Sequence, residues 1–185
     1  MFNFFKRGTL DPLSVSMVGV KLADRVLVIG CRDPKLIAAL ATKAGLTGRT
    51  CAIDPSAPLV RDAERVTLAE GALVEFTTGA LAPLPYEPAA FDVVVLREVV
   101  RIADAPDPRT IAVESNRVLR PGGRCMVIDG VGSTKTWLWE RSTPANPETA
   151  KTMTDALMSA GFVAARTLAE REGIVFVEAM KRAAL

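Results

Sequence analysis

Short apolar runs recur along the chain, separated by segments in which apolar residues have helical spacing. Five predominantly apolar runs of six residues each lie at 25–30, 49–54, 72–77, 91–96 and 124–129. Runs of this length are typical of strands buried in a parallel sheet. Their alternation with helical segments predicts an α/β fold with a doubly wound, mostly parallel sheet.

Helix-start and helix-stop residues bound the intervening segments. Asp33 followed by Pro34 is typical of an N-cap with proline in the first turn, and Gly45 fits the end of that helix. A second helix is expected from about 58 to 69. The proline-rich stretch 79–90 predicts a loop in place of another helix.

The second half of the chain repeats these signals and then changes character. The pair 107–108 starts a helix that ends at the turn 120–123, and a last helix runs from about 146 to Gly161. Two apolar runs then flank a short polar turn, at 162–170 and 173–181. This pattern predicts a C-terminal antiparallel hairpin at the edge of the sheet.

We expect one domain over residues 1–185, with its core at about 20–181 and an N-terminal extension at 1–19. The apolar part of the start is too short for a signal sequence or a membrane span. We therefore expect a cytoplasmic protein without an integral membrane segment. The pattern leaves the oligomeric state open.

Composition narrows the chemistry. The 23 Lys and Arg nearly balance the 21 Asp and Glu, which favours a small-molecule partner over nucleic acid. The chain has no histidine, which excludes Ser-His-Asp, Cys-His and His-metal mechanisms. Its three cysteines have no metal-ligand spacing, so no metal site is expected and a reducing compartment is favoured.

Ligands of doubly wound sheets bind beyond the carboxyl ends of the strands, where the strand order reverses. The residues at the ends of the first four predicted strands are Gly30, Asp54, Gly79 and Leu96. We therefore expect the site at these positions.

Two passages carry a family resemblance. FDVVVL at 91–96 is followed by RVLRPGGR at 117–124, and the tail at 160–181 has the form of a closing hairpin. Together they resemble the class I S-adenosylmethionine-dependent methyltransferases, particularly those of ubiquinone and menaquinone biosynthesis. The resemblance covers roughly residues 20–181 and implies a Rossmann-like fold, S-adenosylmethionine as cofactor and a small-molecule acceptor.

The resemblance also assigns the cofactor loop. In the family, the first strand runs through an acidic residue into a glycine-rich loop. Here the passage is VLVIGCRDP: Gly30 matches the first glycine, whereas Val28, Arg32 and Pro34 depart from the pattern. The cofactor-binding positions implied by the resemblance are Gly30, Cys31, Arg32, Asp54, Pro55, Gly79, Ala80 and Leu96.

Several of these residues have two interpretations. Arg32 adds bulk where backbone would approach the ligand, yet its guanidinium could pair with the cofactor's carboxylate or face solvent. Asp33 with Pro34 is a helix cap, whose free backbone donors could also meet an anionic group. Asp54 either accepts hydrogen bonds from the ribose hydroxyls or caps the following helix. Ala80 stands where the family often places an acidic contact to adenine.

Candidate substrate contacts follow the fourth strand and the fifth. Arg97 and Glu98 directly follow the fourth predicted strand and are candidate substrate contacts. The alternative interpretation is that they form an ion pair at the surface. Trp137, near Trp139, could line a substrate mouth or pack under a loop. No catalytic residue is identified.

Two functions from different classes remain. The first is S-adenosylmethionine-dependent methyl transfer to a small molecule, which needs orientation more than a protein acid or base. The second is a non-catalytic binding or regulatory module, since the architectural motifs match while the cofactor loop is altered. A nicotinamide-dependent oxidoreductase is less favoured because GCRDPK lacks the later glycines of G-x-G-x-x-G.

Overall fold

A computed structural model describes residues 10–99, 106–130, 147–171 and 173–184. Seven strands form one sheet in the order β3-β2-β1-β4-β5-β7-β6. The strands are β1 (Arg25–Ile29), β2 (Arg49–Asp54), β3 (Glu75–Thr78), β4 (Phe91–Arg97), β5 (Leu119–Gly130), β6 (Phe162–Arg171) and β7 (Ile174–Lys181). The helices are α1 (Pro12–Val18), α2 (Pro34–Ala44), α3 (Ala57–Ala69), α4 (Pro108–Val118) and α5 (Pro147–Ser159).

The sheet confirms the predicted fold class. Strands β1 to β5 pair in parallel, and β7 pairs antiparallel with both β5 and β6. The predicted C-terminal hairpin is therefore present, with β6 at the edge and β7 inserted beside β5. The order reverses between β1 and β4, because the chain passes outward from β1 through β2 to β3 and then returns to β4 on the other side of β1.

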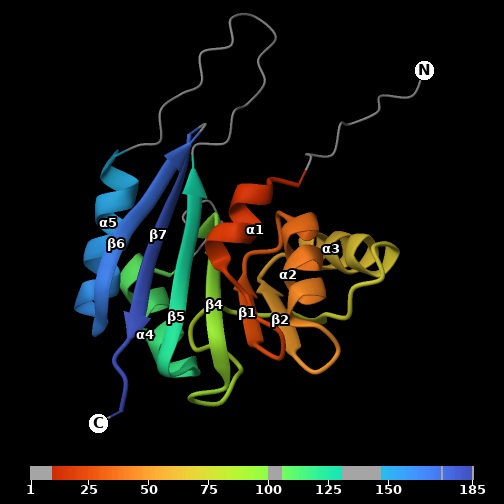
Figure 1. Ribbon diagram of the computed structural model, residues 1–185, viewed down its shortest axis with the longest axis horizontal. Coiled ribbons are helices and arrows are strands. Elements are labelled where there is room, and N and C mark those ends of the chain that lie inside the picture. The colour runs from red at the N-terminus through yellow and green to blue at the C-terminus, as the bar shows by residue number, and fades with distance from the viewer. Residues whose placement is uncertain (1–9, 100–105, 131–146, 172, 185) are drawn as a thin grey trace, which may run out of the picture.

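Helices cover both faces of the sheet (Figure 1). Helices α1, α2 and α3 pack on the face to which Val26 and Val28 of β1 point. Helices α4 and α5 pack on the opposite face, with Leu27 and Ile29. Successive strand residues point to opposite faces, so a strand covered on both sides needs an unbroken apolar run, as the sequence of β1 supplies.

Three elements differ from expectation. The run 72–77 yields only the four-residue β3, because Ala72 packs against Ala38 and Ala41 of α2 instead of pairing with β2. Strand β5 begins at Leu119, before the expected 124, with a register irregularity opposite β4. The expected turn 120–123 thus lies within the strand.

The third difference is α1, which lies in the segment expected to be an extension. Asp11 caps this helix by accepting hydrogen bonds from the amides of Leu13 and Ser14, both at 3.1 Å. Val15 and Val18 are buried against the α2 side of the sheet. Residues 12–18 therefore contribute to the core. Burial of the two valines stabilises the folded chain by about 3 kcal/mol.

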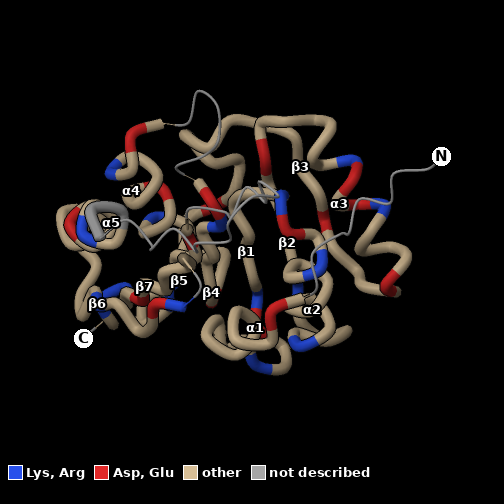
Figure 2. The backbone as a smooth tube through the Cα atoms, turned by 90° about the horizontal axis from the view of Figure 1, so that it is seen from above, with Lys and Arg blue, Asp and Glu red and all other residues tan. Residues whose placement is uncertain are grey.

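Charge is distributed evenly over the described residues. Figure 2 shows basic and acidic residues interspersed around the fold rather than gathered by sign. None of the described helices combines the length and hydrophobicity needed to cross a bilayer.

Candidate functional site

The carboxyl ends of the parallel strands β1 to β5 lie along one border of the sheet, here called the carboxyl edge. Gly30 directly follows β1, Asp54 ends β2, and Leu96 lies one residue before the end of β4. The Gly79 amide, just after β3, donates to the Asp54 carbonyl at 3.2 Å. The structure therefore brings together all four strand-end positions predicted from the sequence.

Gly30 allows the backbone that leaves β1 to lie close to the backbone at the end of β4. Its φ is 102°, and a Cβ at this position would lie 2.2 Å from the Arg97 carbonyl oxygen. Its amide donates to the Ile53 carbonyl at 2.9 Å. The glycine is thus required where the chain leaves β1 and passes the end of β4, before any ligand is considered.

The Asp54 side chain joins the two loops that follow β1 and β2. It is fully buried, and its Oδ2 accepts from the Cys31 amide at 2.9 Å while Oδ1 accepts from the Ser56 amide at 2.8 Å. Ser56, not Asp54, is the N-cap residue of α3. The carboxylate therefore fixes the loop after β1 relative to β2, and each oxygen retains a further lone pair as acceptor.

Cys31 contributes its backbone amide to this site, while its thiol is buried. Burial, with a smaller contribution from the nearby Asp54 carboxylate, raises the pKa of its thiol to about 12. The thiol therefore stays protonated near neutral pH and is a poor nucleophile.

A cluster of charges links the β1–α2 loop to the end of β4. Asp33 caps α2 by accepting from the Leu36 amide at 3.1 Å, and its other oxygen receives Arg97 Nη2 at 3.3 Å. Arg97 Nη1 lies 2.9 Å from Glu98 Oε1 and donates to the Ile128 carbonyl at 3.4 Å. The Arg97 and Glu98 side chains are only 11% and 16% exposed, so their ion pair belongs to the site rather than to the open surface.

A cavity of about 380 Å³ surrounds the start of α2. It is lined by residues of α1 and its cap, the β1–α2 loop, α2, α3, β4 and β7: Asp11, Ser14, Arg32, Asp33, Pro34, Lys35, Asp62, Val66, Arg97 and Ile174. The predicted contacts Arg32 and Arg97 therefore share one cavity. Its lining carries both charge signs.

The other predicted residues contribute unequally. Pro55 and Ala80 are exposed at the carboxyl edge, and Gly79 is half-buried. Leu96 is fully buried in the apolar core on the α4 and α5 side of the sheet. Trp137 and Trp139 lie outside the described residues.

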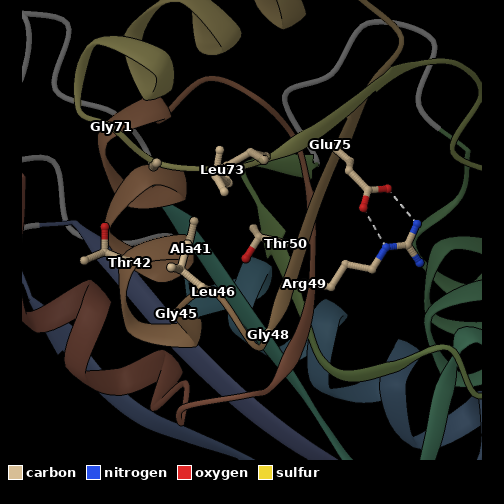
Figure 3. Close-up of a pocket in the computed structure, with 12 residues that line it drawn as sticks. Ala41, Thr42, Gly45, Leu46, Gly48, Arg49, Thr50, Gly71, Leu73 and Glu75 are labelled. Atoms are coloured by element: carbon tan, nitrogen blue, oxygen red, sulfur yellow. Dashed lines mark hydrogen bonds and ion pairs between the residues drawn. The ribbon is translucent and has the colours of Figure 1, made fainter.

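A second hollow, of about 580 Å³, lies at the opposite border of the sheet. Figure 3 shows Arg49 and Glu75 pointing toward each other on one of its sides, with Leu46 and Leu73 on another; the ion pair has a shortest distance of 2.6 Å. Arg49 begins β2, so this hollow is separated from the carboxyl edge by the length of that strand. A ligand that binds beyond the carboxyl ends of the strands, where the strand order reverses, would not lie in this hollow.

Residues 27–127 match the methyltransferase domain family, which is more than half of the chain. The chain therefore belongs to this methyltransferase family. The matched region runs from β1 into β5 and includes the carboxyl edge from Gly30 to Glu98, but not the end of β5.

Other comparisons agree with this membership. The ubiquinone biosynthesis O-methyltransferase of Xylella fastidiosa is 34% identical over 122 residues, which are 64% of this chain and 48% of that protein. The present chain thus spans about half the length of that relative.

Solved structures share the fold. A S-adenosylmethionine-dependent methyltransferase from Aquifex aeolicus superposes with a TM-score of 0.72 at 21% identity, covering 92% of this chain and 93% of its own. The cyclase SpnF superposes with a TM-score of 0.70 at 17% identity, covering 93% and 79% respectively. At these identities the likeness concerns the fold alone.

Sequence reasoning missed part of this candidate site. The Asp33–Arg97 ion pair joins residues 64 positions apart, and no local signal indicates such a pairing. Asp129 was missed although a signal existed, because it closes an apolar strand as Asp54 does. It is buried at the carboxyl edge, and its Oδ1 accepts from the Gly130 amide at 2.8 Å.

Proposed function

We propose that this chain transfers a methyl group from S-adenosylmethionine to a small molecule, with the cofactor bound at the carboxyl edge. The observation that carries the proposal is the Asp54 carboxylate beside Gly30 and Cys31 at the strand-order reversal, in a chain of the methyltransferase family. A carboxylate at a strand end is suited to accept hydrogen bonds from a pair of ribose hydroxyls.

The residues present fit this cofactor. Asp54 has one acceptor position left on each oxygen after its two backbone hydrogen bonds. The cavity at the start of α2 contains both signs of charge, as an amino-acid group requires. Because the Asp54 side chain is fully buried, binding requires the segments that cover it to move.

Binding and orientation are the tasks of this chain's own residues. When bound, S-adenosylmethionine supplies a methyl group on a positively charged sulfur. Asp54 holds the ribose, and the backbone of Gly30 and Cys31 forms the adjoining wall. Holding donor and acceptor in line supplies much of the acceleration in such a transfer, so the absence of histidine is no obstacle. The protonated Cys31 thiol does not compete with the acceptor for the methyl group.

Calorimetry with S-adenosylhomocysteine tests the proposal. We expect micromolar binding, weakened about tenfold or more by Asp54→Asn, because a charge-assisted hydrogen bond becomes a neutral one. Glu64→Gln, an exposed change on α3, is the matched control and should leave the affinity unchanged. Circular dichroism of Asp54→Asn checks that it folds. Absence of heat with the native chain at millimolar ligand contradicts the proposal.

A second candidate function is a non-catalytic binding or regulatory module. It is favoured by the side chains of Arg32 and Pro34 at loop positions where the family has glycine, and by the enclosure of Asp54. The cyclase SpnF also has this fold, so the fold by itself does not determine methyl transfer. In the same calorimetric titration, absence of heat with S-adenosylhomocysteine would favour this second function over methyl transfer.

A further inference from the structure

We propose that Arg32 and Lys35 form a binding site for the carboxylate or phosphate group of a small organic anion, in the cavity around the start of α2. The inference deepens the proposed function, because it names a chemical group that the ligands of the same site must carry. It depends on which charges lining the cavity are already paired.

The acidic side chains of the cavity are engaged within the protein. Asp11 accepts from the Leu13 and Ser14 amides and from the Ser14 hydroxyl, the last at 2.8 Å. Asp33 accepts from the Leu36 amide and from Arg97. Asp62 forms an ion pair with Arg65. The carboxylates of the lining are therefore held by other groups of the protein, and within the described residues none of them is paired with Arg32 or Lys35.

The basic side chains differ from one another. Arg97 is paired with Asp33 and Glu98. Arg32 is exposed and Lys35 is half-buried, and within the described part of the chain no ion pair joins either of them to a carboxylate. Two cations that have no ion-pair partner among the described residues, three positions apart in the sequence, therefore line the same cavity. A ligand anion between them would gain charge-assisted hydrogen bonds from both.

The cavity also contains apolar surface, which indicates an organic anion rather than a bare ion. Val66 and Ile174 line it, and so does the ring of Pro34. Its volume of about 380 Å³ exceeds what one carboxylate needs and lies in the range of small-ligand pockets. The ligand chemistry that fits is therefore an acidic group on a small apolar scaffold.

Benzoate and benzamide are suitable probes, because they have nearly the same shape and differ in charge. Titration of the full chain, followed through backbone amide NMR shifts, should place benzoate at residues 32–36. Its affinity should fall roughly tenfold in the double variant Arg32→Gln, Lys35→Gln. Lys43→Gln, an exposed lysine in the last turn of α2, is the matched control and should bind benzoate as the native chain does.

Three results would overturn the inference. The native chain could fail to bind benzoate, the double variant could retain full affinity, or benzamide could bind as tightly as benzoate. None of these depends on S-adenosylhomocysteine. If benzoate binds and S-adenosylhomocysteine does not, the proposed methyl transfer is contradicted and the anion site is supported. If S-adenosylhomocysteine binds and benzoate does not, the proposed function is supported and the anion site is contradicted.

A competition experiment identifies the source of the anionic group. If S-adenosylhomocysteine displaces benzoate whereas 5′-methylthioadenosine, which lacks the amino-acid end, does not, the pair holds the cofactor's carboxylate. If benzoate binds together with S-adenosylhomocysteine, the pair holds an acidic group of the methyl acceptor. Either result supports the Arg32–Lys35 site.

Discussion

At the scale of single residues, the carboxyl edge depends on how closely backbones approach one another. Gly30 lies between the end of β1 and the Arg97 carbonyl, and no side chain fits there. Asp54 then fixes the following amide, that of Cys31, from the neighbouring strand. The shape of the candidate cofactor loop is therefore set by one glycine and one buried carboxylate.

This arrangement predicts the effect of Gly30→Ala. The added methyl would overlap the Arg97 carbonyl and stand at an unfavourable φ, so we expect a loss of at least about 3 kcal/mol in the free energy of unfolding. Gly71→Ala is the control, since Gly71 also has positive φ but nothing lies near its missing side chain. It should cost about 1 kcal/mol. Equal losses in urea denaturation would show that the close approach at Gly30 does not matter.

The sequence predicted where several site residues lie, but not the contacts between residues that are distant in the sequence. The positions of Gly30 and Asp54 followed from their places at the ends of apolar runs. The bond from Cys31 to Asp54 and the Asp33–Arg97 pair did not, because each joins segments brought together by the sheet. Arg32 was open between solvent and ligand, and its place in the lining of the cavity required coordinates.

At the scale of elements, most helices and strands were predictable because their signals are local. The cap at Asp33 and the apolar run of β1 identified the first strand and helix before any contact was known. Helix α1 has the same aspartate–proline start, but its seven residues are too few for a periodic pattern to stand out. Strand β3 was overestimated because burial against α2 looks the same in a sequence as burial in a sheet.

Helix capping gives a prediction at this scale. The Asp107 side chain accepts from the Arg109 amide at 2.7 Å at the start of α4, whereas Ser56 makes no side-chain capping bond at the start of α3. We expect Asp107→Ala to lower the free energy of unfolding by about 1 kcal/mol, and Ser56→Ala to change it by only a few tenths of that. Chemical denaturation of the two variants checks this, and a larger loss for Ser56→Ala would contradict it.

At the scale of the whole molecule, an acidic residue connects three strands at the border opposite the site. Asp92 of β4 accepts from the Arg25 amide of β1 at 2.7 Å and is paired with Arg120 of β5. Burial alone raises the pKa of its carboxyl, but hydrogen bonds from Arg120 and Arg25 outweigh burial and hold the pKa below its ordinary value.

Stability should therefore depend on pH through Asp92. A folded pKa below the unfolded one means that the ionised carboxylate stabilises the native state above about pH 4, and that this contribution is lost as the pH falls further. The difference in unfolding free energy between the native chain and Asp92→Asn should be largest near neutral pH and shrink below about pH 4. Asp62→Asn, which breaks an exposed pair, is the control. A difference that grows in acid would contradict the assignment.

The order of the strands is what places the candidate site; the sequence predicted a doubly wound sheet with a site at its order reversal, but not the order of the strands. Alternating strands and helices indicated where the sheet order reverses, and the strand-end residues met there as expected. The side-chain network across that edge could not be predicted, since it depends on contacts between β4, β5 and α2. The fold was thus more accessible to sequence reasoning than the chemistry it supports.

The most direct test of the account is to locate bound S-adenosylhomocysteine by backbone amide NMR shifts. We predict the largest changes at Gly30, Cys31 and Ser56, around the Asp54 carboxylate, with little change at Gly45 and Gly48 beside the opposite hollow. Shifts concentrated at Gly45 and Gly48, or none at saturating ligand, would contradict a cofactor site at the carboxyl edge.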